Sequence, residues 1–99
     1  LLSSVQACMP AVLELYERHR QNGDELFRTL QIYLENERSI SRTSEALYTH
    51  RNTVIYRIRK IQDLFDHDLS DPYTREYTLL SIKILYLYHR KTNDHYCKT

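Results

Sequence analysis

The chain has 99 residues, of which 41% are hydrophobic and 27% are charged, and its formal net charge is +1. This length and composition predict one soluble globular domain with a core of modest size. A single glycine and two prolines leave little material for hairpin turns, which argues against an all-β fold. The chain has no apolar run of about 18 residues and no basic segment leading into an apolar run, so we expect neither a membrane span nor a signal peptide.

The first two predicted helices cover about residues 5–21 and 25–36. Pro10 would interrupt the first of them, so a start near Pro10 after a separate turn is the alternative. Gly23 is a typical C-terminal stop, and Asp24 is a typical N-cap for the second helix. Apolar residues at spacings of three and four predict the buried stripes: Val5, Met9, Val12, Leu13 and Tyr16 in the first helix, and Leu26, Leu30, Tyr33 and Leu34 in the second.

A short third helix is predicted to begin after Ser39 or Ser41, either of which can cap it, and to end at about residue 47 or 48. Its expected inward residues are Ile40, Thr43 or Ser44, and Leu47. Thr49 is the predicted N-cap of a fourth helix over about residues 50–65. A short helix, a tight turn and a longer helix form the helix-turn-helix arrangement, here at about residues 39–66.

The fourth predicted helix is the most basic part of the chain. Residues 49–62 hold four Lys or Arg and no Asp or Glu, whereas residues 1–48 and 63–88 each have a net negative charge. At about 100° per residue, one stripe of this helix is apolar and faces inward: Val54, Ile58, Ile61 and Phe65. The remaining residues are mostly polar or cationic: Asn52, Tyr56, Arg59 and Asp63 on the opposite side, and Arg51, Ile55, Arg57 and Lys60 on the flanks. Such a local field can steer a charged partner even though the whole chain is nearly neutral.

A fifth helix is predicted to begin with Asp71 as its N-cap and Pro72 at the first helical position, and to end at about Arg90 before a frayed tail. Its predicted inward stripe is Tyr77, Leu80, Ile84, Leu87 and Tyr88. The remaining apolar residues would form the interface of an expected homodimer: Leu79, Ile82, Leu85 and Tyr86. The predicted fold is therefore a compact all-α bundle of about five helices. It forms a single domain over residues 1–99, in which helices at 5–36 and 71–90 support the helix-turn-helix.

We expect no metal, no cofactor and no catalysis. Cys8 and Cys97 lack the spacing of a zinc site, so we expect reduced thiols in a cytoplasmic protein, with a disulfide between the two ends as the alternative. The acidic segment at residues 63–71 lacks the glycine and the terminal glutamate of a calcium loop. No nucleophile and base are spaced for a common pocket, so the chain is not expected to be an enzyme.

The fourth helix suits double-stranded DNA, whose major groove admits one α-helix with its N-terminal residues at the base edges. Arg can bridge two acceptors of guanine and Asn can pair with adenine, while hydroxyl and cationic side chains suit phosphate oxygens. The candidate DNA-binding residues are Arg42, Thr49, His50, Arg51, Asn52, Thr53, Tyr56, Arg57, Arg59 and Lys60. Simpler roles stay open at this stage: a solvated face for the cations, helix capping for His50, and packing for Tyr56.

Four segments, within a stretch of about residues 5–88, resemble the C-terminal helix-turn-helix domain of PucR/CdaR-type bacterial transcription regulators: "PAVLELYERH" at 10–19, "TLQIYLEN" at 29–36, "SEALYTHRNTVIYRIRKI" at 44–61 and "LSDPYTR" at 69–75. The resemblance implies a DNA-binding output domain joined to an upstream sensory region. Because the chain begins at Leu1 rather than Met, we likewise expect it to be cut from a longer protein.

More distantly, "RNTVIYRI" is similar to the recognition helices of Fis-like domains. That similarity implies a phosphate contact for Arg42, base contacts for His50 and Arg51, and DNA-backbone contacts for Thr53, Arg57 and Lys60. The chain departs from the usual patterns at two positions, with Tyr48 where many such turns have glycine and Ser44 where the family usually has alanine. Two other functions stay open: a helical module that binds an acidic protein, and a domain that binds structured RNA.

Overall fold

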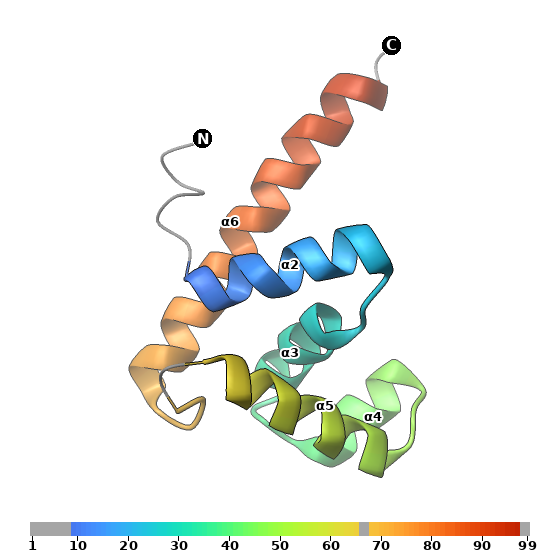
Figure 1. Ribbon diagram of the computed structural model, residues 1–99, viewed down its shortest axis with the longest axis vertical. Coiled ribbons are helices and arrows are strands. Elements are labelled where there is room, and N and C mark those ends of the chain that lie inside the picture. Colours follow the sequence, from blue (N-terminus) through green and yellow to red (C-terminus); the bar gives the residue numbers. More distant parts are fainter. Residues whose placement is uncertain (1–8, 66–67, 98–99) are drawn as a thin grey trace.

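The computed structural model describes residues 9–65 and 68–97, and the side chains among them through residue 89. These residues form five α-helices and no strand, which confirms the predicted all-α bundle. The helices are α2 (Pro10–Asn22), α3 (Leu26–Glu35), α4 (Ile40–Leu47), α5 (Arg51–Leu64) and α6 (Pro72–Cys97). In Figure 1, α2 crosses the long α6, and α4 and α5 lie together at the lower end, beyond α3. Within the described ranges, no helix combines the length and the apolarity that crossing a bilayer requires.

Helix α3 is the centre of the fold because it contacts each of the other four helices. The core around it is one cluster of buried apolar side chains: Met9, Val12, Leu15, Tyr16, Leu26, Phe27, Leu30, Leu34, Ile61, Phe65, Leu69, Ile82 and Leu85. The rings of Tyr16 and Phe27 meet edge to face with their centres 5.4 Å apart. Burial raises the pKa of the Tyr16 phenol. The predicted stripe of α3 is confirmed at Leu26, Leu30 and Leu34.

Helix α2 begins at Pro10, the second of the two predicted starts. Proline suits the first helical turn, because N–H groups at this position have no partner within the helix and its missing N–H therefore costs no hydrogen bond. The predicted stop is confirmed, because Gly23 adopts a φ of 68° and its N–H donates to the carbonyl oxygen of His19 at 3.0 Å. Val5 lies outside the described residues. Leu15 is fully buried, although it was not part of the predicted stripe.

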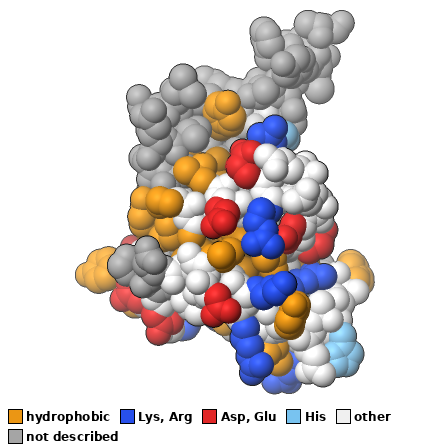
Figure 2. All heavy atoms as spheres, viewed as in Figure 1, with side chains coloured by type: hydrophobic (Ala, Val, Ile, Leu, Met, Phe, Trp, Pro, Cys, Tyr) orange, Lys and Arg blue, Asp and Glu red, His pale blue; other side chains and the backbone are white. Residues whose placement is uncertain are grey.

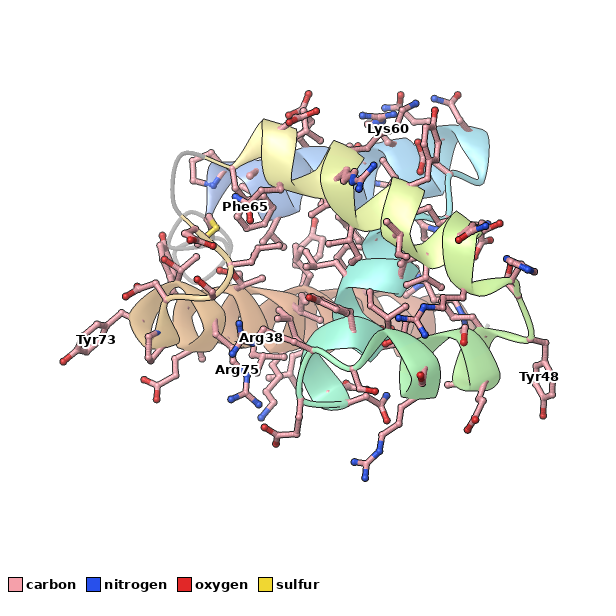
Figure 3. All side chains as sticks on the ribbon, turned by 90° about the horizontal axis from the view of Figure 1, so that it is seen from below. Arg38, Tyr48, Lys60, Phe65, Tyr73 and Arg75 are labelled. Atoms are coloured by element: carbon pink, nitrogen blue, oxygen red, sulfur yellow. The ribbon has the colours of Figure 1, made fainter. Side chains whose placement is uncertain are left out.

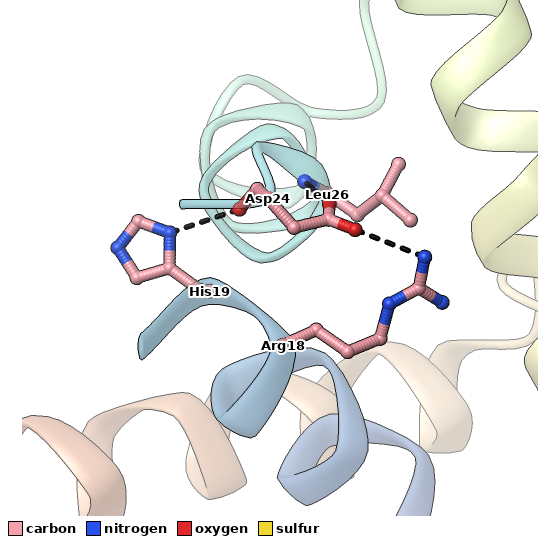
Figure 4. Close-up of polar contacts among 4 residues, drawn as sticks. All are labelled: Arg18, His19, Asp24 and Leu26. Atoms are coloured by element: carbon pink, nitrogen blue, oxygen red, sulfur yellow. Dashed lines mark hydrogen bonds and ion pairs between the residues drawn. The ribbon is translucent and has the colours of Figure 1, made fainter. Parts of the chain in front are cut away.

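Asp24 joins α2 to α3 through three contacts (Figure 4). Its Oδ1 accepts the N–H of Leu26 at 2.8 Å, and its Oδ2 pairs with Nη2 of Arg18 at 2.9 Å. The Nδ1 of His19, in the tautomer that has its proton there, donates to the carbonyl oxygen of Asp24 at 2.9 Å. The N-cap of α3 is Glu25, so the prediction that Asp24 is the N-cap is wrong by one residue, although the Asp24 carboxylate accepts the N–H of the first helical residue, Leu26.

Arg75 of α6 holds the connection between α3 and α4. In that connection Glu37 and Arg38 have φ values of 56° and 60°. For residues other than glycine this left-handed backbone costs roughly 1–2 kcal/mol each. Nη2 of Arg75 lies 3.3 Å from a carboxylate oxygen of Glu37 and donates to the carbonyl oxygen of Leu34 at 3.5 Å. Figure 3 shows the Arg38 and Arg75 side chains on the same side of the molecule.

The face of α6 that packs on the core is not the predicted one. The buried residues are Thr74, Thr78, Ser81, Ile82 and Leu85. Of the predicted stripe, Ile84 and Tyr88 are partly buried, but Tyr77, Leu80 and Leu87 are 43%, 56% and 60% exposed. Small polar residues can occupy the packed face because their hydroxyls have hydrogen-bond partners there. Ser81 Oγ accepts the N–H of Met9 at 2.9 Å, and Thr78 Oγ1 donates to the carbonyl oxygen of Thr74 at 2.6 Å.

Two further expectations about α6 are wrong. Ile82 and Leu85 are 2% and 1% exposed, so these two residues belong to the core of one chain and not to a dimer interface. The helix also continues past Arg90 to Cys97, because no proline or glycine follows Pro72 to end it. Its predicted start is confirmed, since Asp71 Oδ2 accepts the N–H of Thr74 at 3.0 Å.

The described part of the chain contains only some of the residues considered for metal or thiol chemistry. Cys8 and Asp66 lie outside the described residues, and nothing is described of the Cys97 side chain. Among the residues that are described, no three His, Cys, Asp or Glu side chains are grouped to hold a metal ion. In the α5–α6 connection, the N–H of Ser70 donates to Asp68 at 2.9 Å and lowers the pKa of that carboxyl.

Candidate nucleic-acid interface

Helices α4 and α5 form a helix-turn-helix with a three-residue turn. Ser39 caps α4 by accepting the N–H of Arg42 at 3.2 Å. Thr43, one of the two alternatives predicted for this position, is the residue of α4 that is fully buried, and its hydroxyl donates to the carbonyl oxygen of Ser39 at 2.7 Å. Tyr48 ends α4 with φ 51° and ψ 45°, the left-handed conformation for which glycine is usual. Its ring is 97% exposed and points away from the turn (Figure 3).

The N-cap of α5 is His50, so the prediction that Thr49 caps this helix is wrong. His50 has the extended backbone that an N-cap needs, with φ −70° and ψ 145°. Its Nδ1 accepts the N–H of Asn52 at 3.0 Å. The N–H of Thr49 instead donates to the carbonyl oxygen of Ser44 at 3.0 Å and completes the end of α4. The imidazole therefore has the structural role that was the simpler alternative for His50.

The inward stripe predicted for α5 is confirmed. Val54 and Ile61 are fully buried, Phe65 is 8% exposed, and Ile58 packs against the core while partly buried. With this stripe packed on α3 and α4, the opposite side of the helix faces solvent. Arg51 and Asn52, which lie in the first turn, are exposed. No acidic residue lies in that turn, so the positive end of the helix dipole is not neutralised there.

Arg57 is half-buried and reaches back to the centre of the fold. Its Nη1 donates to the hydroxyl oxygen of Thr29 at 3.3 Å. Thr29 is fully buried in α3, and its own hydroxyl donates to the carbonyl oxygen of Glu25 at 2.8 Å. The guanidinium of Arg57 thus joins the outer helix α5 to the central helix α3 and restricts the orientation of α5.

A hollow of about 510 Å³ lies beside α5, between this helix and the α2–α3 connection. Four of the candidate DNA-binding residues line it together: Thr53, Tyr56, Arg57 and Lys60. The other lining residues are Arg18, Asn22, Asp24, Glu25 and Leu26, which the sequence analysis did not associate with the site. No local pattern could have revealed them, because only the packing of α2 and α3 brings them to α5. Asp24 adds a negative charge to the hollow, but that charge is paired with Arg18.

Lys60 and Tyr56 form a cation–π pair on the solvent side of α5. Nζ of Lys60 lies 5.1 Å from the centre of the Tyr56 ring, and this ring is 58% exposed. In Figure 3, Lys60 points away from the body of the molecule. Such a pair orders two long side chains that would otherwise move freely in solvent.

The other six candidates lie outside the hollow. They are Arg42, Thr49, His50, Arg51, Asn52 and Arg59, and all of them are exposed except the half-buried Thr49. Most of these six lie on the turn and the first turn of α5, so the ten candidates form two neighbouring groups rather than one. Figure 2 shows Lys and Arg side chains gathered over the lower part of the molecule, where α4 and α5 lie.

Comparison with known proteins agrees with this geometry. The family described as "PucR C-terminal helix-turn-helix domain" matches residues 26–84. The chain belongs to this family. It is 38% identical over 74 residues to the "Purine catabolism regulatory protein" of Bacillus subtilis (strain 168). This alignment covers 75% of the chain and 14% of that protein. It is 35% identical over 71 residues to the "Proline-responsive transcriptional activator PutR" of the same organism, which covers 72% of the chain and 17% of that protein. No solved structure matches the chain significantly.

This PucR-type domain is a DNA-binding output domain, and its family does not favour the protein-interaction alternative. The chain spans about one-seventh and one-sixth of the lengths of these two relatives, whose names are those of regulators. The matched residues run from the start of α3 into α6 and leave α2 outside. Within the PucR match, the segment "LSDPYTR" supplies structural contacts: Leu69 is buried, Asp71 caps α6, and Arg75 holds the α3–α4 connection.

Proposed function

We propose that this chain recognises a specific double-stranded DNA sequence, with the N-terminal turn of α5 in the major groove. The observation that supports this most directly is the exposure of Arg51 and Asn52 in a first turn without acidic residues. Arg pairs with two acceptors of guanine and Asn pairs with adenine, and each good pair discriminates by about 1–3 kcal/mol. In this proposal Arg51 and Asn52 read bases, and His50 reaches a base edge or a phosphate while it caps α5.

The other candidate residues would bind the DNA backbone. Arg42 lies exposed in the first turn of α4, and the N-terminus of this helix meets phosphate in helix-turn-helix complexes. Thr53, Tyr56 and Lys60 offer a hydroxyl, a phenol and an ammonium along one side of α5, and Arg59 adds a further exposed cation. Arg57 has a double role in the proposal, because its contact with Thr29 leaves other N–H groups of the guanidinium for a phosphate.

We further propose the setting in which this domain acts. It would be one domain of a longer bacterial transcription regulator, with an upstream sensory region, no catalytic activity of its own, and a place in the cytoplasm where the chromosome lies. Two copies of the domain would bind a two-fold symmetric site, because one recognition helix contacts few bases.

The test is selection of bound sites from a random duplex pool, followed by titration of the selected and a scrambled duplex at two salt concentrations. We expect tighter binding to the selected duplex, with an affinity that falls as salt rises, because Lys and Arg displace counterions from phosphates. The Arg20→Ala variant is the matched control, since Arg20 is an exposed cation of α2 whose contacts, with Glu17 and Tyr16, lie away from the proposed surface. Equal affinity for both duplexes would contradict sequence-specific reading, and salt-independent binding would contradict phosphate contact.

A further inference from the structure

Helix α6 has a row of apolar side chains on the side that faces solvent. Tyr73, Tyr77, Leu80 and Leu87 are 81%, 43%, 56% and 60% exposed, and Ile84 is partly buried. These five residues, here called the α6 seam, follow one another at spacings of four, three, four and three. This is the seven-residue repeat by which two helices pack along each other in a coiled coil. Scattered apolar surface residues are common in monomers, but a continuous row with this repeat is typical of an interface.

The seam has an inner edge that meets the rest of the chain, where Ile84 packs against the core and Tyr77 lines a hollow beside the start of α2. Its open edge is formed by Tyr73, Leu80 and Leu87. The packed face consists of Thr74, Thr78, Ser81, Ile82 and Leu85, which lie against α2 and α3. At about 100° per residue, the middle of the packed face and the row Tyr73, Leu80 and Leu87 are separated by roughly 140° around the helix. Figure 3 shows Tyr73 pointing away from the molecule at the start of α6. A second helix can therefore approach the seam from its open edge, along Tyr73, Leu80 and Leu87.

The charges beside the seam indicate which partner fits. Glu76 and Lys83 are exposed and flank the seam on its open side, seven residues apart and each directly before a seam residue. If an identical helix runs antiparallel, with the two-fold axis between residues 78 and 79, Tyr77 packs beside Leu80 of the second copy. Glu76 then lies opposite Lys83 of the second copy, and the same pair forms twice. A parallel pairing would place Glu76 near Ser81 and lose both ion pairs.

We propose that the α6 seam binds the same seam of a second copy of this chain in antiparallel orientation. Four apolar side chains per copy pair in this register (Tyr73, Tyr77, Leu80 and Ile84), because Leu87 would face residue 70, which precedes α6. They make an interface smaller than the roughly 800 Å² per partner of a standard stable complex. The dimer is therefore weak and reversible without DNA. It becomes tight when two recognition helices bind adjacent half-sites, because each copy raises the effective concentration of the other. This proposal concerns a surface distinct from α5, so dimerisation can be tested separately from the recognition of DNA bases.

The first experiment measures the mass of the 99-residue chain by sedimentation from low micromolar to millimolar concentration, with a reductant that keeps Cys8 and Cys97 reduced. We expect a monomer–dimer equilibrium for the natural sequence and a monomer throughout for Leu80→Lys. Tyr48→Lys is the control, because Tyr48 is equally an exposed large apolar residue but lies far from α6 in the turn before α5. A natural chain that stays monomeric at millimolar concentration, or a Leu80→Lys variant that still dimerises, overturns the proposal.

The second experiment exchanges the charges. Glu76→Lys and Lys83→Glu should each weaken the dimer by roughly 3- to 10-fold, since each creates two like-charge contacts. The double variant should restore the natural affinity, because the swapped pairs attract again. Failure of the double variant to restore dimerisation overturns the antiparallel arrangement. Binding of Leu80→Lys to a duplex with a single half-site should match that of the natural chain, which separates loss of the dimer from loss of DNA binding.

Discussion

Nη1 of Arg57 on α5 donates to the hydroxyl of Thr29 on α3 across 3.3 Å, and the two residues are separated by the whole of α4 and its flanking turns. Thr29 has no exposed surface, so the contact reaches from the candidate interface into the core. A buried hydroxyl that accepts from a cationic donor contributes more than a typical neutral hydrogen bond. The orientation of α5, and with it the position of Arg51 and Asn52, therefore depends on a residue that does not face solvent.

The first prediction concerns that contact. Thr29→Val removes the acceptor for Arg57, and we expect it to lower the free energy of unfolding by about 1 kcal/mol. It should also lower DNA affinity a few-fold, because α5 loses one of its restraints. Thr78→Val in α6 is the matched control, since it too removes a buried hydroxyl that donates to a carbonyl oxygen four residues earlier. Urea unfolding and duplex titration measure the two effects. Equal DNA affinities for the two variants would count against a positioning role for Thr29.

The second prediction concerns base reading. Arg51→Ala should cost about 1–3 kcal/mol on the selected duplex and much less on a scrambled one. The physical reason is that Arg51 is exposed in the first turn of α5, so its guanidinium can reach base edges in the major groove. Titration of both duplexes measures the ratio of affinities. A loss of the same size on both duplexes would show instead that Arg51 binds phosphate.

The third prediction concerns phosphate binding. Lys60→Ala should weaken binding to all duplexes by a similar factor and lower the slope of log K against log salt by about 0.9, the contribution of one phosphate contact. Tyr56 also loses its cation–π partner in this variant. Titrations over a range of salt concentrations, with Arg20→Ala as the control, give the slopes. An unchanged slope for Lys60→Ala would place this ammonium away from the DNA.

The fourth prediction separates two roles of His50. His50→Ala removes the N-cap of α5 and should lower the free energy of unfolding by about 1 kcal/mol. His50→Asn should stay within roughly 0.5 kcal/mol of the natural chain, because asparagine is a favoured N-cap. If the imidazole also reaches DNA, as proposed, the Asn variant binds DNA a few-fold more weakly despite its intact fold. If the Asn variant binds DNA with the affinity of the natural chain, His50 caps α5 and does not contact DNA.

The fifth prediction concerns the left-handed residue of the turn. Tyr48→Gly should keep or raise the free energy of unfolding by up to about 1 kcal/mol, because relief of the left-handed backbone outweighs the greater freedom of glycine in the unfolded chain. Tyr48→Val should lower it by about 1–2 kcal/mol, since a β-branched side chain fits this conformation poorly. Urea unfolding of the two variants measures the difference. A Gly variant less stable than the Val variant would contradict the conformation of this turn.

The comparison of α5 with α6 explains where sequence reasoning succeeded. In α5 most apolar residues form a single stripe, and the opposite side is polar apart from Tyr56, so the period of the helix was enough to predict that Val54 and Ile61 are buried. In α6 apolar residues occur on two sides, and a sequence pattern alone does not say which side meets the chain's own core. The structure buries the side with Thr78 and Ser81, because small residues with satisfied hydroxyls allow the start of α2 to lie close to α6.

The candidate site likewise has features that the sequence predicted and features that only the tertiary structure shows. The exposure of Arg51 and Asn52 followed from the period of the helix, whereas the hollow beside α5 and the contact between Arg57 and Thr29 did not. The wrong prediction at the turn concerns two neighbouring residues: threonine is the commoner N-cap, yet His50 has the extended backbone and its Nδ1 accepts the N–H of Asn52.

The amino-acid sequence by itself determined the five helices and most of their ends, because caps such as Ser39, Gly23 and Asp71 act through hydrogen bonds to residues two to four positions away. It also determined the basic outward side of α5. Only the tertiary structure decided which side of α6 is core and which is seam, and which distant residues hold α5 in place. Those outcomes depend on how the side-chain volumes and the hydrogen-bonding groups of different helices fit together. The spacing of residues within a single helix does not contain that information.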